Sequence, residues 1–171
     1  WYCRTLWAFR CYAFMKPIYK FIIAVLIPLA VGSLAGYFTA SSVTGWYTTL
    51  VKPSFNPPNW LFAPVWTSLY ILMGIALFLV WNSGAAEDVK RTAVTLFIVQ
   101  LVLNFLWSFV FFYAQQPGWA LVNIILMWIF IFLTILWFGK ISSLSAWLLV
   151  PYICWVSFAT VLNFAIWKLN P

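Results

Sequence analysis

The sequence predicts an all-α protein, an integral membrane bundle of five transmembrane helices. Of its 171 residues, 66% are hydrophobic and only 6% are charged, whereas soluble domains carry roughly 25% charged residues. The apolar residues fall into five runs, each close to the roughly 20 residues that a membrane-spanning helix needs. A soluble fold of this size could not bury so much apolar surface, so the lipid bilayer is the expected environment.

The five apolar runs set the expected helices and their order. We expect spans at 21–40, 61–81, 92–113, 119–139 and 146–167. The connections after the second, third and fourth runs are short, which forces neighbouring helices to run antiparallel. Residues 15–171 should form one membrane domain. Residues 1–14, which precede Met15 and Lys16, are expected to be a non-native extension, or alternatively a basic and aromatic interfacial anchor.

Basic residues are distributed unevenly between the two ends of the predicted helices. Seven lie on the side of the N-terminus and of the second and fourth loops, and two, Lys52 and Lys168, lie on the opposite side. Cytoplasmic loops carry the excess of Lys and Arg in multi-pass proteins. We therefore expect a multi-pass protein of a bacterial cell membrane with its N-terminus in the cytoplasm. The cations are scattered, so a nucleic-acid partner is not expected.

Several chemistries lack the residues that they need. The chain has no histidine, and its only acids are the neighbours Glu87 and Asp88. The three cysteines show no metal-ligand spacing. No metal, no required cofactor and no catalytic residue is therefore expected. An enzyme could use only the redox chemistry or photochemistry of tryptophan and tyrosine, so enzymatic activity is not the favoured interpretation.

The segment 52–66 is rigid and aromatic. It contains four prolines, two tryptophans and two phenylalanines in 15 residues. Proline fixes φ and removes a backbone donor, which favours a stiff extended loop. Such a loop is suited to close over a flat apolar ligand. The alternative is a stiff linker whose rings lie at the depth of the lipid headgroups.

Three predicted helices each carry a stripe that combines rings with a few polar groups. The third helix carries Asn104, whose amide should lie near the middle of the membrane. It needs a hydrogen-bond partner there, because an unpaired amide is costly in lipid. Together the stripes describe an apolar pocket with a few orienting polar groups, although packing between helices explains the same pattern. The stripes are Trp66, Tyr70, Met73 or Gly74, Leu77 and Trp81; Gln100, Asn104, Trp107 and Phe111; and Tyr152, Trp155, Ala159 and Asn163.

The first predicted helix carries a Gly-x-x-x-Gly pair, Gly32 and Gly36. Such a pair lets another helix approach closely. Packing within one chain is the favoured interpretation, and a dimer face is the alternative.

With these motifs in hand, the chain resembles the TspO/MBR family of tryptophan-rich sensory proteins and translocator proteins. The resemblance covers about residues 15–170. It is carried by the ordered segments 45–70, 103–108, 145–155 and 158–170, the first of which contains Lys52-Pro-Ser-Phe-Asn-Pro-Pro-Asn-Trp60.

The resemblance implies a homodimeric five-helix receptor or sensor that binds porphyrins, that is tetrapyrroles, in a cavity closed by the first loop. Alternatives are a transporter of porphyrin, lipid or sterol, a porphyrin-degrading photo-oxidative activity, and a structural subunit that binds nothing small. Phe164 stands where the sterol pattern has tyrosine, which weakens the case for sterol. The implied ligand-binding residues are Tyr47, Pro57, Trp66, Tyr70, Asn104, Trp107, Trp155 and Ala159.

Overall fold

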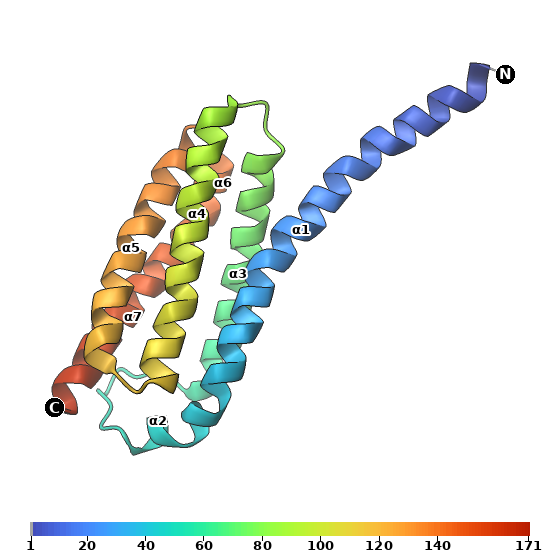
Figure 1. The fold of residues 1–171 in the computed structure, drawn as a ribbon. Helices are drawn as coiled ribbons and strands as arrows, with labels where there is room; N and C mark the ends of the chain where they lie inside the picture. The colour runs from blue at the N-terminus through green and yellow to red at the C-terminus, as the bar shows by residue number, and fades with distance from the viewer. Residues whose placement is uncertain (1) are drawn as a thin grey trace.

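A computed structural model describes the backbone of residues 2–171 and the side chains of residues 17–171. The expected bundle is confirmed, since five segments among the described residues are long and apolar enough to cross a membrane. The chain is a multi-pass membrane protein in which the spans pack as one bundle (Figure 1). These segments are Pro17–Thr44, Asn59–Trp81, Glu87–Tyr113, Pro117–Gly139 and Ser143–Leu169.

Helix α1 (Tyr2–Thr44) is longer than the predicted span 21–40. It includes residues 2–14, and Figure 1 shows its N-terminal part extending beyond the bundle. The side chains of residues 1–16 lie outside the described part, and so does Trp1, the first residue of the expected extension. At the other end, the hydroxyl of Thr39 donates to the carbonyl of Ala35 (2.7 Å), so this polar side chain is satisfied within the helix.

The prediction that residues 41–60, between the first two expected spans, form a loop is wrong for part of this stretch. Helix α1 continues to Thr44, and a short helix α2 (Trp46–Thr49) follows after Gly45. The remaining connection is the extended segment 50–58, in which prolines prevent a further helix. Residues 41–49 precede the proline-rich segment and contain no proline, so proline does not prevent them from forming helix.

The next three helices follow the predicted ranges with shifts at their starts. Helix α3 (Asn59–Trp81) begins after Pro58. Helix α4 (Glu87–Ser108) begins five residues before the predicted 92 (92 − 87), because its two acids lie in the first turn, where they interact favourably with the helix dipole. Helix α5 (Pro117–Gly139) begins at a proline, whose missing N–H is no loss at that position.

The fifth predicted helix is divided in two. Helix α6 (Ser143–Leu148) and helix α7 (Val150–Leu169) meet at Leu149. Pro151 accounts for the break, because a proline ring disrupts the helical hydrogen bond to the preceding turn. Both helices nonetheless belong to one span.

Helix α1 lies against α3, and α4 lies against α5, which in turn contacts α7 (Figure 1). Helices α1 and α3 approach each other closely at Gly74, where an added Cβ would lie 2.5 Å from the Cα of Val25. A side chain at position 74 would therefore push these two helices apart.

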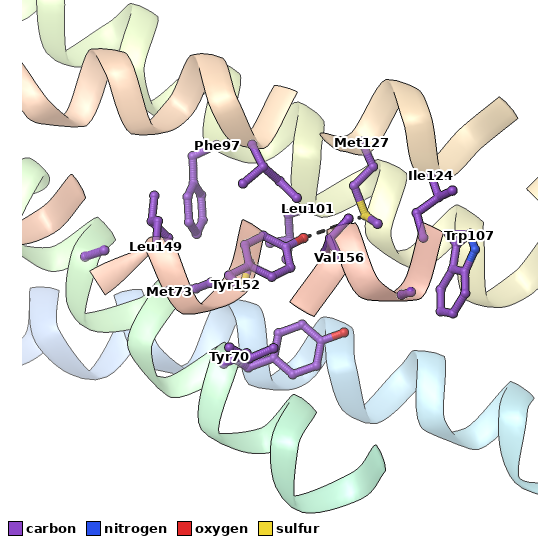
Figure 2. Close-up of a cluster of buried hydrophobic side chains, with 14 of the residues drawn as sticks. Tyr70, Met73, Phe97, Leu101, Trp107, Ile124, Met127, Leu149, Tyr152 and Val156 are labelled. Carbon is purple, nitrogen blue, oxygen red and sulfur yellow. Dashed lines mark hydrogen bonds between the residues drawn. The ribbon is translucent and has the colours of Figure 1, made fainter. Parts of the chain in front are cut away.

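The interior is packed densely at one end of the bundle. The rings of Phe97 and Phe138 are stacked with centroids 5.8 Å apart, and both are fully buried. In Figure 2, Phe97, Met73 and Leu149 lie at one end of the buried cluster, whereas Trp107 lies at the other. We call the first region the packed end and the region around Trp107 and α2 the hollow end.

Candidate functional site

The hollow end contains a cavity of about 410 Å³ between α1, α2, α3 and the C-terminal end of α4. Small-molecule sites commonly occupy roughly 300–1,000 Å³, so the cavity has the size of a ligand site. Its lining residues are Leu29, Gly32, Ser33, Ala35, Gly36, Thr39, Ala40, Val43, Tyr47, Asn59, Phe62, Ala63, Trp66, Thr67, Tyr70, Trp107, Ser108 and Phe112.

Helix α1 supplies a cavity wall of small side chains. Gly32 packs against the ring of Tyr70, so that a Cβ added there would overlap the ring. A Cβ added to Gly36 would meet nothing within 4 Å. One glycine of the Gly-x-x-x-Gly pair thus serves packing within the chain, as favoured from the sequence, and the other faces open space in the cavity wall.

Part of the cavity lining is exposed, which means that the cavity opens sideways. The exposed lining residues are Ser33, Gly36 and Ala40 on α1 and Asn59, Ala63 and Thr67 on α3. Both helices cross the membrane. The opening between them therefore faces the bilayer, from which an apolar molecule can enter.

The opposite wall consists of aromatic rings. Trp66 stacks on Tyr70 with centroids 5.7 Å apart and an interplanar angle of 28°. Its ring also lies 6.3 Å from that of Trp107. The indole N–H of Trp107 donates to Asn163 (3.0 Å), whose own amide donates to the carbonyl of Pro117 (2.8 Å). Because its N–H is already bonded, Trp107 offers the cavity an apolar ring surface.

A π-helical turn, η1 (Phe109–Tyr113), ends the third span beside the cavity. The wider turn changes which side chains face the bundle, and such turns are frequent at functional sites. Phe112 lines the cavity, while Phe111 is buried with its ring 5.6 Å from that of Trp107. The turn thus places two successive rings at the hollow end.

Helix α2 and the segment 50–58, here called the lid, close the end of the bundle (Figure 1). Tyr47 of α2 is buried, and its hydroxyl donates to Asn56 (2.8 Å). Burial raises the pKa of Tyr47 to about 12, against the lowering effect of this hydrogen bond, so the phenol stays neutral. The ammonium of Lys52 lies 4.7 Å from the centre of the same ring. These contacts hold α2 against the segment 50–58.

The lid is also attached to the end of α7. The side chain of Asn170 accepts from the N–H of Val51 and donates to its carbonyl, both at 3.0 Å. A side-chain amide that pairs with both backbone groups of one residue mimics a strand partner. Asn170 therefore holds the extended segment in place.

Four of the predicted ligand-binding residues line the 410 Å³ cavity: Tyr47, Trp66, Tyr70 and Trp107. Trp155 and Ala159 instead line an adjoining hollow of about 20 Å³, which shares Trp66 and Trp107 with the main cavity. The indole nitrogen of Trp155 is buried and has no hydrogen-bond partner among the described residues.

The other two predicted residues line neither space. Pro57 lies in the lid, where its carbonyl accepts from Asn56 (3.0 Å). Asn104 is fully buried and bonds to two tyrosine hydroxyls, Tyr70 on α3 (2.6 Å) and Tyr152 on α7 (3.2 Å). The partners that this buried amide requires are thus side chains of neighbouring helices. This is the packing between helices that the sequence pattern allowed as the alternative to a ligand contact.

Sequence reasoning missed the small residues of α1 and two of the rings in the wall. Phe62 and Phe112 line both spaces. On α1, small residues at positions 32, 33, 36, 39 and 40 recur at helical spacing and share one face. That recurrence was the available signal. In the described part of the chain, no cluster of metal-ligating side chains occurs.

A five-helix membrane bundle with an aromatic cavity beneath a lid defines a class of small, multi-pass proteins with an internal ligand-sized space. The chain belongs to the TspO/MBR family, whose profile matches residues 24–168. This confirms the resemblance that the motifs had indicated.

Three relatives show how far the similarity extends. The chain is 50% identical to the tryptophan-rich protein TspO of Chlorobaculum tepidum over 156 residues, 91% of this chain and 99% of that protein. It is 38% identical to the translocator protein of Homo sapiens over 156 residues, 90% of each chain. It is also 38% identical to a tryptophan-rich sensory protein of Cereibacter sphaeroides over 125 residues, 73% of this chain and 77% of that protein.

Proposed function

We propose that this protein is a membrane receptor or sensor that binds a tetrapyrrole of the porphyrin type in the cavity at its hollow end. The observation that carries the proposal is the 410 Å³ cavity, with stacked aromatic rings on one side and small α1 residues on the other. A flat apolar ring system gains offset stacking and burial from such walls. The family and the names of its relatives support a sensory or translocator role.

The position of the opening supports a ligand that dissolves in the membrane. A flat molecule can enter between α1 and α3 past small residues such as Gly36 and Ala63. A macrocycle too large for the cavity can extend through the same opening. Entry from the bilayer uses the opening between α1 and α3, so it needs no movement of the lid.

Saturable quenching of tryptophan emission by protoporphyrin IX, with the protein in detergent, tests this function. We expect quenching that fits one site and that weakens when Trp66 is replaced by alanine. The matched control is Trp119→Ala, because Trp119 is an exposed ring that lines neither the cavity nor the hollow. Equal weakening by both replacements, or quenching that never saturates, contradicts the proposal.

The same preparation separates binding from its alternatives. Protoporphyrin recovered unchanged after incubation in light and in darkness supports a receptor, whereas a new product in light supports degradation. Accumulation of porphyrin inside sealed proteoliposomes supports transport. A receptor predicts unchanged porphyrin and no accumulation.

We also propose an orientation with the N-terminus in the cytoplasm of a bacterial cell and the lid outside. The start of α4, with Lys90 and Arg91, and the end of α5, next to Lys140, lie at the end of the bundle opposite the lid, which contains Lys52 (Figure 1). This asymmetry follows the positive-inside rule. Cysteines placed at Ser54 and Ser83, in a background without native cysteines, should be labelled from opposite sides of the membrane. Labelling of both from one side contradicts the orientation.

A homodimer is the oligomeric state that we propose from the family resemblance. Light scattering of the detergent-solubilised protein, corrected for bound detergent, should give twice the 19.8 kDa chain mass. A mass of one chain contradicts this state.

A further inference from the structure

The buried polar side chains beside the cavity form one continuous hydrogen-bond chain. The hydroxyl of Tyr70 donates to Asn104 (2.6 Å), the amide of Asn104 donates to Tyr152 (3.2 Å), and the hydroxyl of Tyr152 donates to Gln100 (2.8 Å). These residues come from α3, α4 and α7 and are at most 6% exposed. Tyr70 lines the cavity, and the other three residues line neither the cavity nor the hollow.

The far end of this chain is left incomplete. The amide nitrogen of Gln100 is buried and has no hydrogen-bond partner among the described residues. A buried donor without an acceptor is costly, more so than a carbonyl oxygen that lacks a donor. In Figure 2 the hydroxyl of Tyr152 points toward Met127, whose sulfur, 3.7 Å away, is only a weak acceptor. The present direction of the chain therefore leaves an unsatisfied N–H at Gln100.

Every member of the chain can reverse its role without moving from its place. A hydroxyl both donates and accepts, and an amide exchanges its oxygen and nitrogen by rotating about its last side-chain bond. In the reversed chain, Gln100 donates to Tyr152, Tyr152 donates to Asn104, and Asn104 donates to Tyr70. The unsatisfied N–H at Gln100 is then replaced by an oxygen, and the hydroxyl hydrogen of Tyr70 is free.

We infer that this chain makes Tyr70 a reversible polar anchor for the ligand, and that Gln100 is a positioning residue that biases its direction. In the direction observed, the Tyr70 oxygen can accept a hydrogen bond from a ligand N–H. In the reversed direction, Tyr70 donates to a ligand carbonyl, carboxylate or imine nitrogen. The cavity therefore accommodates flat ligands that present either a donor or an acceptor at this point. Tetrapyrroles carry both N–H and imine nitrogens. The inference rests on the proposed cavity as the ligand site and adds the polarity that the site selects.

Three flat tricyclic probes of similar size separate these states: carbazole offers only an N–H donor, 9-fluorenone only a carbonyl acceptor, and fluorene neither. Titration calorimetry of the full chain in detergent gives a dissociation constant for each. Comparing one probe between parent and variant cancels its partition into micelles. Relative to their micelle partition, we expect the parent to bind carbazole and fluorenone each several-fold more tightly than fluorene.

Replacing Gln100 tests the remote end of the chain. Gln100→Leu removes the acceptor for Tyr152, which penalises the observed direction more than the reversed one. The preference for fluorenone over carbazole should therefore rise by more than twofold and by at most about fivefold to tenfold, the effect of one hydrogen bond, because the replacement also removes the unsatisfied N–H of Gln100. Tyr152→Phe should shift the preference the same way, because the amide nitrogen of Asn104 then finds a partner only at Tyr70. The Tyr152→Phe variant therefore tests the same inference if Gln100→Leu does not fold.

Two further variants fix the interpretation. Tyr70→Phe should make the three probes bind alike, relative to their micelle partition. Leu101→Met, a buried α4 replacement outside the chain, should leave the preference unchanged. A preference that stays within about twofold of the parent in both Gln100→Leu and Tyr152→Phe overturns the inference while leaving the ligand site intact. Failure of the parent to bind any probe overturns the ligand site as well.

Discussion

The two ends of the bundle use the same kind of side chain to opposite effect. At the packed end, Phe97 and Phe138 stack 5.8 Å apart and are completely buried. At the hollow end, Trp66 and Tyr70 stack at a similar 5.7 Å, yet they border a cavity of about 410 Å³. Aromatic pairs are therefore common to both ends and do not themselves create the space.

The difference lies in the residues that face the rings. The packed end is filled by side chains such as Met73, Val80 and Leu149, which are at most 1% exposed. The hollow end faces the glycines and small residues of α1, which have too little volume to fill the gap. A ligand site in this bundle thus depends on what is missing from one helix as much as on the rings of the others.

The largest expected effect is a loss of stability at the packed end. Phe97→Ala removes a fully buried ring and should lower the free energy of unfolding by about 3–5 kcal/mol. Phe112→Ala, at the cavity wall, should cost clearly less because one side of that ring already lacks neighbours. Thermal melts of both variants without ligand measure the difference. Equal losses would show that the two ends are packed alike.

The next effect concerns ligand affinity at the hollow end. Trp66→Ala should weaken protoporphyrin binding about tenfold or more, roughly 1.4 kcal/mol, whereas Trp66→Phe keeps a flat ring and should cost less. Trp155→Ala should have a smaller effect than Trp66→Ala, since Trp155 borders only the 20 Å³ hollow. Fluorescence titration gives the affinities. A larger effect at Trp155 would place the ligand in the hollow instead.

The glycine pair of α1 offers an internal comparison. Gly32→Ala should push the ring of Tyr70 out of place and weaken binding several-fold, because a Cβ there overlaps that ring. Gly36→Ala adds the same methyl group where nothing lies within 4 Å and should change affinity by about twofold or less. Titration of both variants checks this order, and the reverse order would contradict the described wall.

The smallest effect concerns the lid. Asn170→Ala removes both hydrogen bonds to Val51 and should cost about 1 kcal/mol of local stability. Hydrogen exchange in segment 50–58 should become about fivefold faster, while exchange in the packed end stays the same. The matched control is Asn82→Ala, at the opposite end of the bundle. Unchanged exchange in the lid would mean that Asn170 does not hold it.

The sequence predicted the membrane bundle well, because apolar runs of suitable length admit few other interpretations. It predicted the site less fully. The ring stripes identified Trp66, Tyr70 and Trp107, all of which line the cavity. They gave no sign that Trp155 borders the adjoining hollow and not the main cavity, since helical spacing fixes a face and not the depth of its neighbours. For Asn104 they left both a ligand and a neighbouring helix open, and the structure shows bonds to side chains of α3 and α7.

The small residues of α1 show most clearly where sequence reasoning ended. Gly32 and Gly36 have the same spacing as a packing motif, and the packing interpretation describes Gly32 correctly. Whether the second glycine meets a neighbour or a cavity depends on how α1 inclines against α3 beyond their close contact at Gly74. That angle follows from the whole bundle and cannot be derived from α1 alone.

The central claim is that the space between α1 and the aromatic wall is the ligand site, and filling that space tests it most directly. Gly36→Phe places a ring where the structure is open, and Leu34→Phe places the same ring on the exposed side of α1 as the control. Protoporphyrin titration and thermal melts should be measured for both variants. We predict that Gly36→Phe melts like the parent and loses porphyrin binding, whereas Leu34→Phe keeps both. A Gly36→Phe protein that is folded and binds porphyrin with the parent affinity would contradict the claim.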